Sequence, residues 1–222
     1  MSNVILSGSA PETSPRLAGA TPIAAILFAA WLALVTVLGA GGAFVTAPGT
    51  LPLPILIGVT APLIVFLAAV WISRPLREFA LGADLRLLTA IQAWRFAGLG
   101  FLALYANGVL PGAFAWPAGL GDIAIGVTAP WILLELIRRP SFAASKTFVL
   151  WNVLGVLDLV VAVASGALGS GLATGIAGEV TTRPMSQLPL VLIPAYFVPI
   201  FLMLHVSALI QARRVARHSR NG

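Results

Sequence analysis

Residues 53–73 read LPILIGVTAPLIVFLAAVWIS and contain no charged side chain. At a rise of 1.5 Å per residue, about 20 apolar residues cross the roughly 30 Å hydrocarbon layer of a bilayer. Because such runs are continuously apolar rather than alternating with polar residues, they exclude a membrane β-barrel. Including this run, six membrane-spanning helices are expected, over residues 21–44, 53–73, 87–108, 117–137, 147–168 and 189–212.

The composition of the whole chain agrees with this class. Hydrophobic residues make up 59% of the 222 residues and charged residues only 9%, whereas a soluble domain carries about 25% charge. We therefore predict an all-α, polytopic integral membrane protein. The first span is interpreted as a retained helix, because it is longer than a signal peptide's apolar core. Cysteine is absent, which excludes disulfides, thiolate metal ligands and a cysteine nucleophile.

The basic residues give a predicted orientation. All thirteen Lys and Arg except Arg95 and Arg183 lie before the first span, after the sixth, or in the connections between spans 2 and 3 and spans 4 and 5. By the positive-inside rule both termini are cytoplasmic, as expected in a bacterial inner membrane. Residues 1–19 form a disordered cytoplasmic tail, 20–212 the membrane domain, and 213–222 a basic cytoplasmic tail. We expect that basic tail to contact anionic lipid headgroups rather than nucleic acid.

The hexapeptide IGVTAP occurs twice, at residues 57–62 and 125–130. Prolines Pro62, Pro130 and Pro199 then recur at intervals of 68 and 69 residues, and Pro194 lies in the same predicted helix as Pro199. One interpretation is an array of three repeated helical hairpins, and another is two packed halves of three helices. The four prolines are expected either to bend helices 2, 4 and 6 around a central space or to permit close helix packing.

Three charged residues lie inside predicted spans, and composition does not explain them. A charge at the centre of a membrane helix costs roughly 2.5–3.5 kcal/mol on insertion scales, so such groups pair, lose their charge or line water. Arg95 is expected one to two turns from the cytoplasmic face and Asp158 near the middle of its helix. Asp122 is expected one to two turns below the outer end, in a helix that Pro117 opens.

The depth of Arg95 is shared by other polar residues. We expect a core cluster of Gln92, Arg95, Asn152, Asp158 and His205. Arginine presents a bidentate fork of donors, so Arg95 either pairs with Asp158 to register two helices or holds the carboxylate or phosphate of a ligand.

Asp122 has two interpretations of its own. An acid in the second turn of a helix is favoured by the helix dipole, and the alternative is an outward-facing proton or cation site. His205 is the only histidine of the bundle, which excludes bis-histidine haem ligation within one chain, and we expect no metal site. No cofactor can be assigned from the residues.

The sequence favours a small-solute carrier without naming a solute. Serine-hydrolase, zinc-protease and Asp-rich phosphotransferase motifs are missing, which argues against an enzyme. The alternatives are a membrane-embedded enzyme or a lipid-, quinone- or cofactor-binding protein, or a structural subunit. A carrier requires a cavity that reaches the buried charges, an enzyme requires His205 near an open wall, and a scaffold requires a closed ion pair. The expected partners are the lipid bilayer and further copies of the chain.

Overall fold

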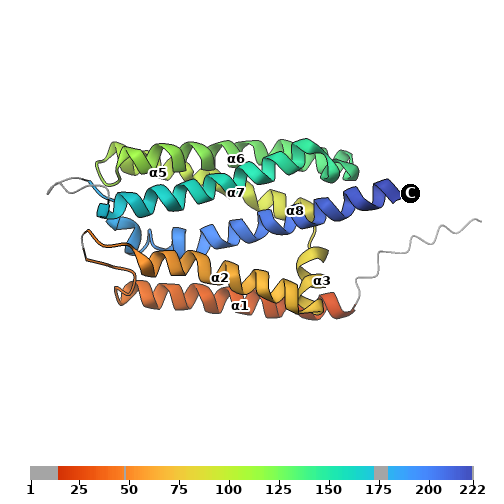
Figure 1. The fold of residues 1–222 in the computed structure, drawn as a ribbon, viewed down its shortest axis with the longest axis horizontal. Coiled ribbons are helices and arrows are strands. Elements are labelled where there is room, and N and C mark those ends of the chain that lie inside the picture. The colour runs from red at the N-terminus through yellow and green to blue at the C-terminus, as the bar shows by residue number, and fades with distance from the viewer. Residues whose placement is uncertain (1–14, 48, 173–179, 222) are drawn as a thin grey trace, which may run out of the picture.

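The computed structural model describes residues 15–47, 49–172 and 180–221, and within these ranges it contains helices and no strand (Figure 1). Six helical segments are long and apolar enough to cross a membrane. They are Pro22–Ala40, Leu53–Ile72, Leu85–Ala106, Gly112–Arg138, Lys146–Gly171 and Ile193–Arg217. The predicted all-α bundle with six membrane-spanning helices is confirmed. The disorder expected for residues 1–14 lies outside the described residues.

The elements follow one another along the chain as α-helices joined by short 3₁₀ and π segments, labelled η. In chain order they are α1 Pro15–Ala40, α2 Leu53–Ile72, α3 Arg74–Gly82, α4 Leu85–Ile91, η1 Gln92–Gly98, α5 Leu99–Ala106, α6 Gly112–Arg138, η2 Pro140–Ala144, α7 Lys146–Ala167, η3 Leu168–Leu172, η4 Arg183–Ser186, η5 Ile193–Phe197 and α8 Val198–Asn221.

The two ends of the bundle differ in what they carry. The C-terminal end of α8, the short helix α3 and the connection between α6 and α7 lie at one end, here called the basic end (Figure 1). The α5–α6 turn and the short elements η3 and η4 lie at the other end, here called the loop end. The positive-inside prediction makes the basic end cytoplasmic.

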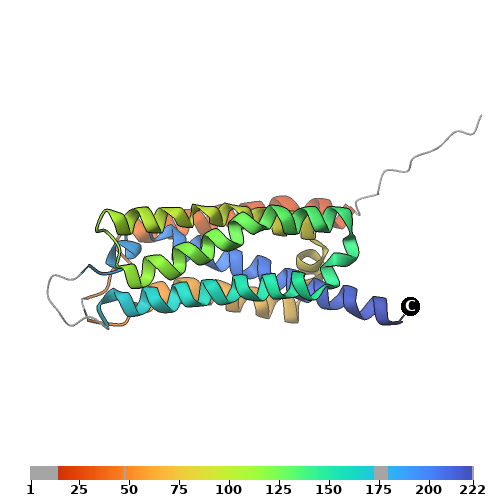
Figure 2. The same ribbon diagram turned by 90° about the horizontal axis from the view of Figure 1, so that it is seen from above.

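Helix α8 occupies the middle of the bundle. It packs against α7 on one side and α2 on the other (Figure 1). Helix α6 packs on η1, α5 and α7 (Figure 2). Helix α1 lies at the edge, where its main packing partner is η5, and Val37 on this helix is 69% exposed. Apolar side chains exposed on this scale face acyl chains in a bilayer-spanning protein.

Several predicted helix boundaries were wrong. Helix α1 begins at Pro15, so residues 15–19 are helical rather than part of a disordered tail. Helix α6 begins at Gly112, and Pro117 therefore lies inside it instead of opening it. A membrane helix tolerates this proline because neighbouring helices can satisfy the freed carbonyl. The expected basic tail after residue 212 is a helical continuation of α8 to Asn221.

The apolar run over 87–108 predicted one continuous α-helix for the third span, and this prediction was wrong. The middle turn of this span, η1, is a 3₁₀ segment of seven residues between α4 and α5. Segment η1 lies very close to α6, where the contact depends on glycine. A Cβ added at Gly126 would overlap the backbone of Phe96, and one added at Gly119 would lie 3.1 Å from the carbonyl oxygen of Gly98. The first repeat hexapeptide also uses its glycine in packing, since a Cβ at Gly58 would lie 3.3 Å from the Cβ of Ala195.

An apolar core fills the basic-end half between α6, η2, α7 and α8. One stripe of α6 faces this core, and its spacing of three to four residues is that of a helix face. The buried members of the core are Ile125, Ala129, Ile132, Leu136, Ala143, Phe148, Trp151, Ala208 and Ala212.

Candidate functional site

The site begins with the 3₁₀ geometry of η1. A 3₁₀ helix has three residues per turn, so residues three apart lie on one line. Gln92, Arg95 and Gly98 are the buried residues of this segment, while Trp94 between them is 76% exposed. The tighter helix therefore turns one polar amide, one guanidinium and one glycine inward together.

Arg95 is enclosed by acceptors from three helices. Its Nε donates to Oδ1 of Asp122 at 2.7 Å, and its Nη2 donates to Oδ2 of Asp158. Its Nη1 donates to the carbonyl oxygen of Gly155 at 3.3 Å and lies 3.1 Å from Nε2 of His205. Four of the five guanidinium N–H groups are thereby used, and none of the Arg95 side chain is exposed.

The hydrogen bonds fix the tautomer of His205. Arginine can only donate, so Nε2 of His205 accepts from Arg95 and carries no proton. Nδ1 then carries the ring proton and donates to Oδ1 of Asn152 at 2.9 Å, and the Asn152 amide donates to the carbonyl oxygen of Phe148. The histidine is neutral in this arrangement and extends the polar network toward the basic end.

The charges of the cluster do not cancel. Arg95 contributes one positive charge and the two ionised carboxylates contribute two negative charges, which leaves one surplus negative charge. Each carboxylate uses one oxygen on Arg95, and no other described residue donates to the remaining oxygens of Asp122 and Asp158. A buried surplus charge is costly, so the cluster has a strong tendency to take up one proton or one cation.

Two glycines leave the space that the side chains of Asp158 and His205 occupy beside Arg95. A Cβ added at Gly121 would overlap the carboxylate of Asp158, and a Cβ added at Gly155 would overlap the ring of His205. Helices α6 and α7 therefore approach closely enough for Arg95 to span both acids.

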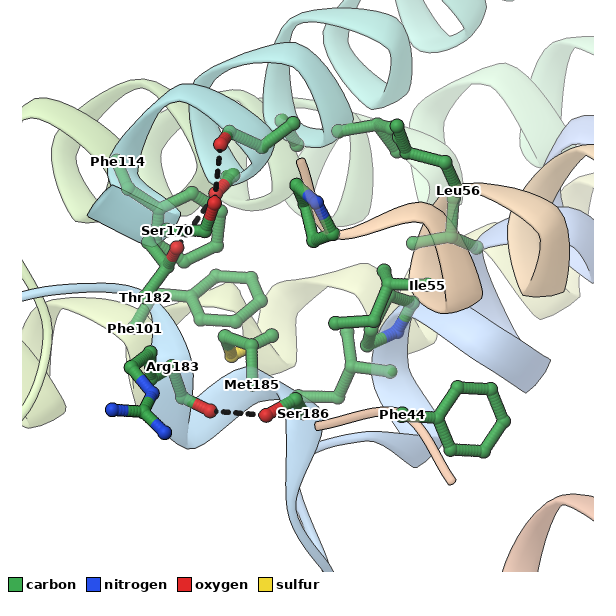
Figure 3. Close-up of a pocket in the computed structure, with 18 of the residues that line it drawn as sticks. Phe44, Ile55, Leu56, Phe101, Phe114, Ser170, Thr182, Arg183, Met185 and Ser186 are labelled. Atoms are coloured by element: carbon green, nitrogen blue, oxygen red, sulfur yellow. Dashed lines mark hydrogen bonds between the residues drawn. The ribbon is translucent and has the colours of Figure 1, made fainter. Parts of the chain in front are cut away.

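A cavity of about 70 Å³ enters the bundle from the loop end and reaches Asp122. Its wall comes from α2, α5, α6, α7, η3, η4, η5 and α8, with further residues from the connection before α2 (Figure 3). Asp122 lies ten residues after Gly112, so it is about 15 Å along α6 from that end. The Asp122 side chain is 17% exposed.

Asp158 borders a different opening. A shallow groove runs along the flank of the bundle between α6 and α7, and Gly121, Thr128, Trp151 and Asp158 are among the residues that line it. The Asp158 side chain is 12% exposed. The two acids that share Arg95 thus contact two separate spaces.

Two buried polar atoms beside the cluster have no hydrogen-bond partner among the described residues. They are Oγ1 of Thr89 and Oε1 of Gln92, one turn apart on the basic-end side of Arg95. The amide nitrogen of Gln92 donates to the carbonyl oxygen of Phe201 at 3.3 Å. Leaving such an atom unsatisfied costs about 1–3 kcal/mol.

Sequence reasoning predicted the Arg95–Asp158 neighbourhood but placed Asp122 apart from it. The structure brings Asp122 onto the same guanidinium as Asp158, because α6 starts five residues earlier than predicted. Arg95 is covered by both acids and lines neither opening. Its guanidinium therefore has no pair of free N–H groups that an anionic ligand could reach. Thr89 and the two glycines Gly121 and Gly155 were not predicted. The spacing of Gln92, Arg95 and Gly98 by three residues was a signal in the sequence for a 3₁₀ segment with these residues on one face.

The four prolines expected to bend helices occupy different settings. Pro62 and Pro130 lie inside α2 and α6, Pro194 lies in the π-helical turn η5, and Pro199 follows in the first turn of α8. Pro194 also lines the cavity. Bending and the internal repeat remain predictions. Among the described residues no three His, Cys, Asp or Glu side chains are grouped as metal ligands.

Comparison with known proteins adds one finding. A family model described as "Domain of unknown function (DUF8737)" matches residues 52–213, which begins just before α2 and ends in α8. No curated protein and no solved structure matches the chain.

Proposed function

Because the chain belongs to the family described as Domain of unknown function (DUF8737), whose description names no activity, we propose from its site that it is a proton-coupled carrier of a small solute. The loop-end cavity is its solute site, and Arg95 with Asp122 and Asp158 is its coupling site. The observation that carries the proposal is the single buried guanidinium held by two acids, one of which lines a cavity.

The unbalanced charge of the cluster explains how coupling would work. With one proton on either carboxylate the cluster is neutral, and without it the cluster carries one negative charge. A cationic solute or a proton can each cancel that charge, so the two compete for one site. Buried ionisable residues inside a membrane bundle are the usual elements of such coupling.

The cavity has an opening at the loop end, whereas an apolar core fills the basic-end half. This is the arrangement of a carrier in its outward-open state, if the basic end is cytoplasmic. In the inward-open state the path of the solute would pass the polar side chains on the basic-end side of Arg95. Thr89, Gln92 and Asn152 lie there, and the two unsatisfied atoms mark the point where water would enter.

The groove beside Asp158 favours a second candidate, a protein that binds a lipid or quinone from the bilayer. Its walls are apolar and it opens on the flank of the bundle. An enzyme acting on such a molecule is less well supported, because His205 lines neither the groove nor the cavity. A purely structural role is less well supported because both acids are partly exposed.

The proposal is tested by uptake into liposomes that contain the purified protein. A panel of labelled amines, amino acids, carboxylates and sugars is offered with and without an imposed proton gradient. We expect gradient-dependent uptake of at least one solute, and its loss in Asp122→Asn and Asp158→Asn. Glu135→Gln is the matched control, since Glu135 pairs with Arg139 at the basic end, away from the cluster. Equal uptake by protein-free liposomes, or wild-type uptake by both Asp variants, would overturn the proposal.

A further inference from the structure

The walls of the loop-end cavity are almost entirely apolar. Aromatic side chains from α5 and α6, Phe101 and Phe114, face it from one side, and Ile55 and Leu56 of α2 lie on the other (Figure 3). Met185 of η4 lies between them. A molecule that fills this space must offer an apolar body to such walls, because a polar one would lose its hydration without replacement.

Among the described residues that line the cavity, three of the four hydroxyl groups have already used their protons, and the fourth belongs to Thr46. Thr182 donates to the carbonyl oxygen of Gly166 at 2.6 Å, Ser170 to that of Ala167 at 2.7 Å, and Ser186 to that of Arg183 at 2.7 Å (Figure 3). Each of these hydroxyl oxygens is left with acceptor capacity only. These three groups therefore suit a ligand that donates hydrogen bonds.

Among the described residues, Asp122 is the only acid that lines the cavity. It lies on the far side of the space from the loop end and keeps one oxygen that no described residue satisfies. Arg95 behind it is wholly covered, so an entering molecule meets the carboxylate before the guanidinium. The surplus negative charge of the cluster therefore acts on the cavity.

Arg183 is the one other charged residue that the described part of the chain contributes to the wall. Its guanidinium points away from the space that the aromatic and aliphatic side chains surround (Figure 3). No cationic group of the described residues therefore faces a ligand inside the cavity, so an anion would find no favourable charge there.

From these features we propose that the cavity binds a small apolar amine as its ammonium cation, with the nitrogen at Asp122 and the hydrocarbon against Phe101 and Phe114. Ammonium is donor-only and carries three N–H groups, which suit the free oxygen of Asp122 and the three hydroxyl groups that can only accept. The inference rests on the proposed function in one respect, since it names the substrate class of the same carrier site.

The size of the cavity narrows the class further. An engineered protein cavity of about 150 Å³ holds benzene, and this cavity of about 70 Å³ is half that volume. A short aliphatic amine of roughly three carbons fits such a space. Larger amines must extend toward the loop-end opening.

The experiment uses the absence of cysteine from the natural chain. Ala162→Cys places one thiol on the cavity wall, and its rate of reaction with a water-soluble methanethiosulfonate reports whether the cavity is occupied. Propylamine, propan-1-ol and propionate serve as probes of equal size with positive, zero and negative charge. We expect half-maximal protection at a concentration at least about tenfold lower for propylamine than for the alcohol, and none from propionate.

Asp122→Asn in the Ala162→Cys background is expected to remove the preference for propylamine over propan-1-ol. If the double variant does not fold, the comparison of the three probes on Ala162→Cys alone still tests whether the cavity prefers the amine. Equal protection by all three probes, or protection by propionate, would overturn the inference. Protection by propylamine without proton-driven uptake would instead overturn the carrier function and leave the amine site standing.

Discussion

The loop-end and basic-end halves of the bundle are built from the same helices but are filled differently. Between α6, α7 and α8 the basic-end half holds a close-packed core in which Ala129 and Phe148 are fully buried. The loop-end half holds a cavity that reaches Asp122. The Arg95 cluster lies at the boundary between them. The contrast teaches that the cavity reaches Asp122 from the loop end and not from the basic end, and four predictions test it, from the largest expected effect to the smallest.

The largest effect is expected from Arg95→Gln. It leaves two carboxylates without their partner, and breaking a buried ion pair costs about 3–5 kcal/mol. We expect a loss of that order in the free energy of unfolding, measured by denaturant titration in mixed micelles. The triple variant Arg95→Gln, Asp122→Asn, Asp158→Asn removes all three charges and should recover most of the stability while losing transport. An Arg95→Gln protein as stable as wild type would show that the cluster does not hold the halves together.

Gly121→Ala is expected to have the next largest effect. Its Cβ would overlap the Asp158 carboxylate, so the acid must leave Arg95 or the helices must separate, and overpacking of this kind costs about 1–3 kcal/mol. Gly100→Ala is the matched control, because a Cβ there meets nothing within 4 Å. That helical position should gain up to about 1 kcal/mol. Similar unfolding curves for both variants would contradict the close seating of Asp158.

An alanine-to-leucine substitution in each half compares how tightly the two halves of the bundle are packed. Ala129→Leu adds volume to the packed core, and we expect about 1–3 kcal/mol of destabilisation. Ala162→Leu adds the same volume to the cavity wall and should change the free energy of unfolding by less than about 1 kcal/mol, while it blocks uptake. Thermal unfolding and uptake are measured for both. The contrast between the halves fails if Ala162→Leu destabilises as much as Ala129→Leu.

The smallest effect is expected at the basic end of α8. Arg213→Gln should weaken binding of phosphatidylserine by about 1 kcal/mol. Titration of the detergent-solubilised protein with a fluorescent phosphatidylserine measures this. Arg183→Gln, at the loop end, is the control and should leave the titration unchanged. A larger effect of Arg183→Gln would contradict the assignment of the lipid contact to the basic end.

The sequence predicted the membrane class and the approximate spans because apolar length alone determines them. It also placed Arg95 near Asp158, since both are charges that cannot face lipid. It missed that Asp122 joins them, because the start of α6 depends on tertiary packing around Pro117 and not on the local proline signal. The cavity was not predictable in its details, since its wall combines residues from eight helical elements whose relative positions depend on glycine contacts such as Gly126 on Phe96.

The central claim is that a cavity enters the bundle at the loop end while the basic end is closed. Its most direct test is thiol accessibility in the membrane. Ala162→Cys and Ala208→Cys each introduce the only thiol of the chain, one on the cavity wall and one in the basic-end core. A membrane-impermeant thiol reagent is applied to intact cells and to inside-out vesicles. The account predicts labelling of the thiol at position 162 from one side only and none at position 208 from either side. An unlabelled position 162, or equal labelling of both positions, would contradict it.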